Sequence, residues 1–123
     1  MKPHKSRLAG RDMVAGAHAL SESPEEITTP GRGQIKAMLI NCGNPVVSGP
    51  DGAKLDKALA QLDLLVAIDF VQRESHRHAH WLLPAVHWLE RNDLLAFTSN
   101  MHDEPYLQYG AKAVEPPQGA RQE

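Results

Sequence analysis

Cysteine is nearly absent from this chain, because Cys42 is the only one among 123 residues. An internal disulfide is therefore impossible, and a single thiol fits a reducing, cytoplasmic environment. Long hydrophobic runs are also absent: the apolar stretches fall well short of the roughly 20 residues that a membrane-spanning helix needs. The basic residues near the N-terminus have no apolar segment behind them, unlike a secretory signal. We therefore expect a cytoplasmic protein without a membrane partner.

Charge of one sign is not in excess either. The chain has 13 Lys and Arg against 15 Asp and Glu, for a net charge of −2. Because the basic residues are scattered, we expect no nucleic-acid partner. The G-x-G-x-x-G and P-loop motifs are missing, so the common dinucleotide and triphosphate fingerprints do not apply. A hydrophobic fraction of 41% is ordinary for a soluble globular domain, and the length suits one domain.

Apolar residues are concentrated in the middle of the chain. Residues 1–33 are polar and rich in turn formers, and residues 101–123 carry little to bury. We predict that both end segments are irregular. The foldable part is residues 34–100, which is small for a domain that must be stable by itself.

The first half of this part predicts a strand, a loop and a helix. Residues 35–41 form a short apolar run that is typical of a strand buried on both faces. Residues 42–52 contain the glycines and prolines of a loop. In residues 53–63, Leu and Ala recur at i, i+3, i+4 and i+7, which predicts an amphipathic helix. Asp51 is suited to be its N-cap.

Two further strands complete the predicted sheet. Residues 64–70 are a second continuous apolar run, and residues 80–86 form a third that Pro84 cuts short. A strand–helix–strand unit of this spacing gives parallel strands with a right-handed crossover. The sequence therefore predicts an α/β fold: a small, Rossmann-like parallel sheet of about three strands with a βαβ crossover and irregular termini.

Polar residues follow the first two predicted strands. Asn41, Gly43 and Asn44 come after the first, and Asp69 ends the second. Open parallel sheets bind ligands beyond the carboxyl ends of their strands, and an acidic residue there can hold the donor groups of a nucleotide. The alternative is that Asp69 only ends a strand and that the glycine and asparagine only form a turn.

The segment ESHRHAH, residues 74–80, has histidines at alternate positions: His76, His78 and His80. In an extended segment their rings would point to one side, about 6 to 7 Å apart. Imidazoles so placed can share Zn²⁺ or Ni²⁺, although a specific site normally recruits a further ligand. A histidine-rich metal-binding protein is therefore one hypothesis for this chain.

Several short motifs occur here in a characteristic order: an apolar strand, G-N-P, a helix ending in L-D, an apolar strand closed by Asp, an E-S-x-R-H-A segment and L-P. Their positions are Gly43-Asn44-Pro45, Leu62-Asp63, Ile68-Asp69, Glu74-Ser75, Arg77-His78-Ala79 and Leu83-Pro84. In this order and spacing the chain resembles the molybdopterin oxidoreductases, the family of formate dehydrogenases, nitrate reductases and dimethyl sulfoxide reductase. The resemblance covers residues 10–123, nearly the whole chain.

The resemblance implies a cofactor and a set of binding residues. In that family this segment belongs to an α/β domain that holds molybdopterin guanine dinucleotide, two copies of which bind molybdenum or tungsten. By resemblance, the carboxylate of Asp69 accepts hydrogen bonds from N1–H and the exocyclic amine of guanine. The cofactor-binding residues implied are Gly43, Asn44, Pro45, Asp69, Glu74 and Ser75.

The chain also departs from the family pattern. Arg73 stands where the family usually has Asn or Thr, and His80 replaces an Asp. No cysteine cluster is present for an iron–sulfur centre, and no residue matches the family's molybdenum ligand. Cys42 is expected to be a small buried thiol instead. We therefore predict no catalytic residue in this chain, and no turnover by the chain alone.

The leading hypothesis is a fragment of a molybdopterin-dependent oxidoreductase that contributes part of a guanine dinucleotide-binding domain. Its expected partners are the remaining segments of the catalytic subunit, or further copies of itself. The alternatives are a stand-alone nucleotide-binding or interaction module without catalysis, and the histidine-rich metal-binding protein.

Overall fold

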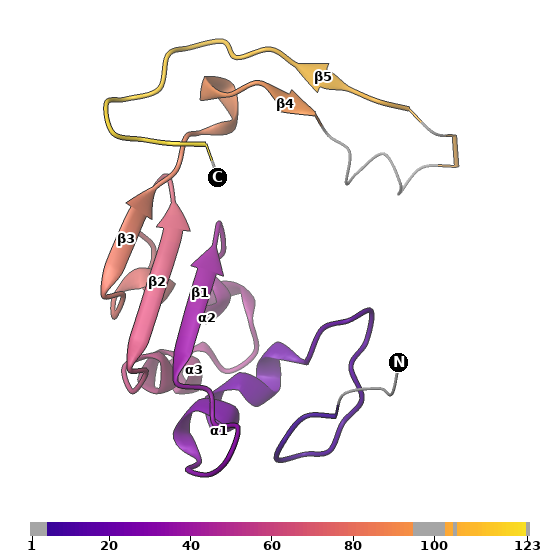
Figure 1. Cartoon of the computed structure of the whole chain (residues 1–123), viewed down its shortest axis with the longest axis vertical. Coiled ribbons are helices and arrows are strands. Elements are labelled where there is room, and N and C mark those ends of the chain that lie inside the picture. The colour runs from indigo at the N-terminus through magenta and orange to yellow at the C-terminus, as the bar shows by residue number, and fades with distance from the viewer. Residues whose placement is uncertain (1–4, 95–102, 105, 123) are drawn as a thin grey trace.

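A computed structural model describes residues 5–94, 103–104 and 106–122. Its centre is a three-stranded parallel sheet in the order β1-β2-β3 (Figure 1). The strands are β1 (Ala37–Asn41), β2 (Leu64–Asp69) and β3 (Trp81–Pro84). The chain passes through helix α3 (Gly52–Leu59) between the parallel strands β1 and β2, so the predicted α/β fold with its βαβ unit is confirmed.

Helix α3 begins and ends for identifiable reasons. Asp51 precedes it in a left-handed conformation, with φ of 51°, and its carboxylate accepts from the Lys54 N–H at 3.3 Å, as the N-cap prediction requires. Leu55 and Leu59 are each 1% exposed and face the sheet core. The helix stops four residues before its predicted end, because the chain tightens into i→i+3 bonds such as Leu62 N–H to the Leu59 carbonyl.

A second, one-turn helix, α2 (Pro45–Ser48), lies within the predicted loop. Pro45 occupies its first turn, where a missing N–H costs nothing. The helix packs directly on the start of α3, since a Cβ atom added at Gly52 would lie 1.8 Å from the Val46 carbonyl oxygen. Only glycine fits at this contact, which fixes the segment that follows β1 against α3.

The N-terminal segment differs from the prediction. Residues 5–33 include the 3₁₀ turn η1 (Leu20–Glu22) and helix α1 (Ser23–Thr28), so this part is not wholly irregular. Ile27 of α1 is 2% exposed and shares the core with Leu55. A six-residue helix with one core-facing aliphatic residue has no detectable hydrophobic period, which is why the sequence pattern does not indicate it.

The C-terminal residues lie beyond the carboxyl ends of the strands, in the upper part of Figure 1. They include the 3₁₀ turn η3 (Trp88–Glu90) and the antiparallel pair β4 (Asp93–Leu94) and β5 (Tyr109–Gly110). A bridge between Ala85 and Arg121 ties this segment to the end of β3. The predicted boundary between residues 100 and 101 falls outside the described residues.

One face of the sheet is buried and the other is open. Ile40 and Ala67 are register partners on the buried face, at 6% and 0% exposure. Leu39, on the opposite face of β1, is 61% exposed, and Trp81 of β3 is 66% exposed. The expectation that residues 35–41 are buried on both faces is therefore wrong. A continuous apolar run identifies a strand that is suited to burial on both faces. It does not show whether another element packs on the second face.

The helices of the described ranges are all too short or too polar to cross a membrane.

Candidate functional site

The segments that follow β1 and β2 are joined through the side chain of Asn44. Its Nδ2 donates to Glu74 Oε2 at 2.7 Å. Its Oδ1 accepts from both the backbone N–H and the hydroxyl of Ser75, at 3.2 and 2.7 Å. The sequence places these residues about thirty positions apart, and the parallel sheet brings them to one edge.

Ser75 is the buried member of this network. It is 0% exposed, and its hydroxyl oxygen also accepts from the Val46 N–H of α2 at 2.8 Å. The hydroxyl therefore donates to Asn44 and accepts from Val46, so it holds two residues of the segment after β1. Pro45, the first residue of α2, is held at the edge by this contact with its neighbour. The turn η2 (Glu74–His76) carries Ser75 to its position.

Asp69 lies at the carboxyl end of the central strand, and its side chain is only 1% exposed. Its Oδ1 accepts from the Phe70 N–H at 2.8 Å, and its Oδ2 accepts from Arg73 Nε at 2.9 Å. Both carboxylate oxygens therefore have a hydrogen-bond donor, as a buried polar group requires. The site thus contains a buried carboxylate that two donors hold at the strand end.

The His76 side chain lies between Asp69 and the loop after β1. Its ring is 1% exposed; Nδ1 accepts from the Arg73 N–H at 3.2 Å, and Nε2 lies 3.1 Å from the Gly43 carbonyl oxygen and 3.9 Å from Asp69 Oδ2. Because Nδ1 accepts, the proton belongs on Nε2, which donates to Gly43. The sequence pattern does not indicate this role, since a histidine in a polar segment carries no signal of burial.

Glu74 is the exposed acidic group of the edge. A hydrogen bond from its own backbone N–H and one from the Asn44 amide lower the pKa of its carboxyl, and the charges of Arg77 and Arg73 add to this effect. Together with Gln72, Arg73 and Arg77, Glu74 lines a shallow hollow of about 330 Å³. The solvent side of the edge therefore carries both a carboxylate and two guanidinium groups.

The structure brings together all six residues that the resemblance implies. Gly43, Asn44 and Pro45 follow β1, Asp69 ends β2, and Glu74 and Ser75 form η2, all at one edge. We name this group the strand-end site. Its residues are Gly43, Asn44, Pro45, Asp69, Glu74, Ser75 and, in addition to the predicted set, Arg73 and His76.

The three alternate histidines face three different partners. His76 contacts Gly43, the Nε2 of His78 lies 3.2 Å from Asp56 Oδ1, and the Nδ1 of His80 accepts from the Leu65 N–H at 3.0 Å. Residues 74–76 form a 3₁₀ turn and not the extended segment that a shared metal would require. Among the described residues no group of three or more His, Cys, Asp or Glu has the geometry of a metal site.

The expectation that Cys42 is a buried thiol is wrong. Cys42 is exposed and has φ of 48°, because it turns the chain out of the edge strand β1 toward Gly43. A left-handed backbone conformation is uncommon for residues other than glycine, so the residue type of Cys42 does not indicate it.

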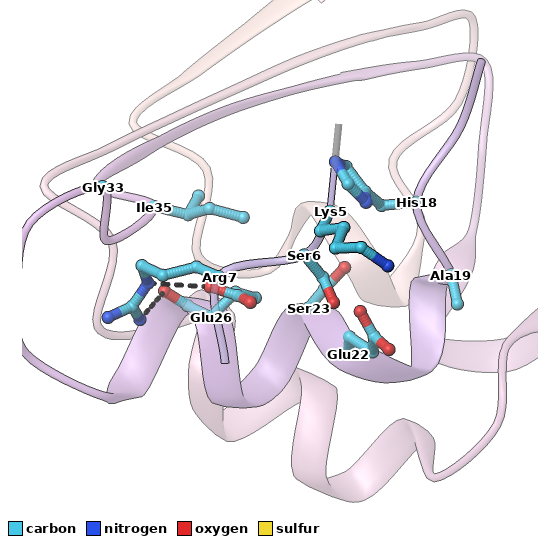
Figure 2. Close-up of a pocket in the computed structure, with 10 residues that line it drawn as sticks. All are labelled: Lys5, Ser6, Arg7, His18, Ala19, Glu22, Ser23, Glu26, Gly33 and Ile35. Carbon is cyan, nitrogen blue, oxygen red and sulfur yellow. Dashed lines mark hydrogen bonds and ion pairs between the residues drawn. The ribbon is translucent and has the colours of Figure 1, made fainter. Parts of the chain in front are cut away.

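A separate cavity of about 230 Å³ lies between the N-terminal segment and α1 (Figure 2). Gly33 and Ile35, which precede β1, form part of its wall, so it lies toward the amino end of that strand and away from Asp69. In its wall Arg7 Nε pairs with Glu26 Oε2 at 2.9 Å, and the Leu8 N–H donates to Glu26 Oε1. These contacts attach the N-terminal segment to α1 and explain the polar lining.

The fold and the site define a class of protein. Polar side chains that converge beyond the carboxyl ends of neighbouring parallel strands are the arrangement by which open α/β sheets bind nucleotide-like ligands. Residues 5–123 match the family model for molybdopterin oxidoreductase. The chain therefore belongs to the molybdopterin oxidoreductase family, and membership implies molybdopterin as the cofactor.

Curated relatives agree with this assignment. The chain is 39% identical over 94 residues to the F420-dependent formate dehydrogenase subunit alpha of Methanocaldococcus jannaschii, covering 76% of this chain and 13% of that protein. It is 36% identical over 83 residues to a nitrate reductase of Klebsiella oxytoca, with 63% and 10% covered. It is 34% identical over 82 residues to the thiosulfate reductase molybdopterin-containing subunit PhsA of Salmonella typhimurium, with 67% and 11% covered. The chain thus spans about a tenth of the length of these relatives.

Proposed function

We propose that the strand-end site binds the guanine end of molybdopterin guanine dinucleotide. The observation that carries this proposal is the buried Asp69 carboxylate at the end of the central strand, whose Oδ2 already accepts from a planar N–H donor, Arg73 Nε. Guanine presents the same type of donor at N1, with the exocyclic amine beside it. The chemistry of the site therefore fits the base.

The surrounding residues support a role in holding the ligand. The network of Asn44, Glu74 and Ser75 joins the two strand-end segments through protein contacts alone, and such rigidity lowers the ordering cost of binding. The segment 43–45 follows β1 at the same edge, where it is able to contact the nucleotide portion. Arg77 and Arg73 supply positive charge beside the edge for its phosphates.

In the complete enzyme we propose that two such dinucleotides hold molybdenum or tungsten and that the reaction is electron or oxygen-atom transfer. The cofactor supplies the redox chemistry, and this chain supplies part of its binding. The relatives include a formate dehydrogenase, a nitrate reductase and a thiosulfate reductase, so this segment does not specify which substrate is oxidised or reduced.

Titration calorimetry with GMP and IMP tests the proposal. IMP lacks the exocyclic amine, so a carboxylate that reads both donors binds GMP more tightly, by about tenfold for one charge-assisted hydrogen bond. Asp69→Asn should remove this preference. Asp63→Asn is the matched control, since the Asp63 side chain is 69% exposed and pairs with Lys36 at 3.9 Å. Equal affinities for the two nucleotides in the unaltered chain would contradict guanine recognition.

The open sheet face supports a second function, assembly with other protein. Leu39 and Trp81 are more than 60% exposed on this face, and Leu83 is 46% exposed. Parallel sheets normally have both faces covered. We propose that the partner is a remaining segment of an oxidoreductase subunit or another copy of this chain. This interaction is compatible with nucleotide binding because it uses the face of the sheet and not the strand ends.

A further inference from the structure

Arg73 donates a hydrogen bond to the Asp69 carboxylate, the group that the proposed function assigns to guanine. The Asp69 side chain is 1% exposed, whereas the Arg73 side chain is 35% exposed, so the arginine lies between the carboxylate and solvent. Of the two carboxylate oxygens, Oδ1 accepts from the Phe70 N–H and Oδ2 accepts from Arg73 Nε. A base that approaches Asp69 from solvent therefore meets the arginine first.

The arginine is held at more than one point. Its backbone N–H donates to His76 Nδ1 at 3.2 Å, which fixes the start of the side chain. Its guanidinium carbon lies 5.4 Å from the centroid of the Phe70 ring, a cation–π distance. Phe70 is 47% exposed, and its ring also meets the His87 ring edge-to-face with the centroids 5.0 Å apart, so Arg73 and His87 both contact it. Arg73 thus covers both a hydrogen-bond acceptor and an aromatic surface.

These are the two features that a purine base uses. Guanine N1–H donates to a carboxylate as Arg73 Nε–H does, and a base stacks on an aromatic ring as a guanidinium does. We infer that Arg73 competes with guanine for Asp69, so that the base binds only when the arginine side chain swings out. This inference rests on the proposed function and makes Arg73 a residue that lowers the affinity of the site for the base.

The size of the effect follows from the contact that guanine must replace. A charge-assisted hydrogen bond is strong, but the arginine is one-third exposed and part of its attraction is screened by solvent. We therefore expect removal of the arginine to raise guanine affinity about five- to tenfold. The phosphates complicate the measurement, because the same arginine attracts them. Guanosine, which has no phosphate, isolates the contribution of the base.

The test is an NMR titration of guanosine into the unaltered chain, Arg73→Gln and Arg11→Gln. Arg11 is the matched control: it is 68% exposed and pairs with Glu22 at 3.2 Å in the N-terminal segment, outside the strand-end site. We expect Arg73→Gln to bind guanosine about five- to tenfold more tightly and Arg11→Gln to match the unaltered chain. Adding Asp69→Asn to each should abolish binding.

The outcomes separate the inference from the proposed function. If Arg73→Gln binds guanosine equally well or more weakly while Asp69→Asn still abolishes binding, the competition is overturned and guanine recognition stands. If Asp69→Asn changes nothing, or no variant binds, both fail. If Arg73→Gln does not fold, the salt dependence of guanosine binding to the unaltered chain tests the same competition. Salt of about 0.5 M weakens the Arg73–Asp69 pair, so guanosine affinity should rise with salt, and a constant or falling affinity overturns the inference.

Discussion

Asn44 and Glu74 lie thirty residues apart in the sequence, and their side chains meet at 2.7 Å. This contact joins the segment after β1 to the turn after β2. With the two bonds from Ser75 to the same asparagine, it fixes the geometry of the strand-end site. The strand-end site is therefore part of the structural framework of the domain as well as its proposed binding surface.

Asn44→Ala should destabilise the domain by about 1–3 kcal/mol, because the N–H and hydroxyl of the buried Ser75 both lose their acceptor. Urea denaturation measures the change. Asn41→Ala is the control: Asn41 is exposed at the end of β1, and its truncation should cost less than about 0.5 kcal/mol. Equal effects of the two substitutions would mean that the network does not hold the edge together.

Gly52→Ala should be strongly destabilising, although alanine is favoured over glycine in a helix by about 1 kcal/mol. The added Cβ would lie 1.8 Å from the Val46 carbonyl oxygen, so α2 must move away from α3. We expect a net loss of more than about 2 kcal/mol in the unfolding free energy. Gly110→Ala, where no atom lies closer than 4.0 Å, should be neutral. A stabilised Gly52→Ala would show that α2 does not pack as described.

Stability should fall in mild acid through Glu26. Burial disfavours its charge, but hydrogen bonds from the Leu8 N–H and the Arg7 side chain outweigh burial and lower the pKa of Glu26 below its usual 4.5. Since the folded value is the lower one, this contribution is complete above about pH 4.5 and is lost as the pH falls through the lowered pKa. Melting curves between pH 6 and about pH 3 should show less acid sensitivity in Glu26→Gln than in the unaltered chain or in Glu104→Gln.

The sequence predicts the parts of the fold that have a clear hydrophobic pattern. The strands ending at Asn41 and Asp69 are continuous apolar runs, and the helix capped by Asp51 is amphipathic, so local patterns determine all three. Helix α1 carries no such period, because its contribution to the core is chiefly Ile27. The open face of β1 is also hidden from the sequence, since burial depends on what covers a strand.

The residues of the strand-end site also fall into those that the sequence predicts and those that it does not. The resemblance implies Asn44, Asp69 and Ser75, and the parallel sheet brings them to one edge. It does not indicate His76 or the pairing of Arg73 with Asp69, because both depend on how the segment after β2 folds back. A 3₁₀ turn of three residues places His76 inward and the other two histidines elsewhere, and such a turn has no reliable sequence signature.

The open sheet face predicts association. Trp81 is 66% exposed on β3, so Trp81→Lys should shift the chain toward monomer in sedimentation velocity and reduce its binding of a hydrophobic dye. Trp88→Lys is the matched control, because Trp88 is 63% exposed but belongs to the turn η3 and not to the sheet. A monomeric unaltered chain that binds no dye would contradict the proposed assembly surface.

The most direct test of guanine recognition is to map, by amide chemical shifts, where GMP binds on the unaltered chain. If guanine binds at Asp69, the shifts concentrate at Asn44, Phe70 and Ser75 and vanish in Asp69→Asn. Shifts that appear instead around Arg7 and Glu26, beside the other cavity, or no shifts at all, would contradict it.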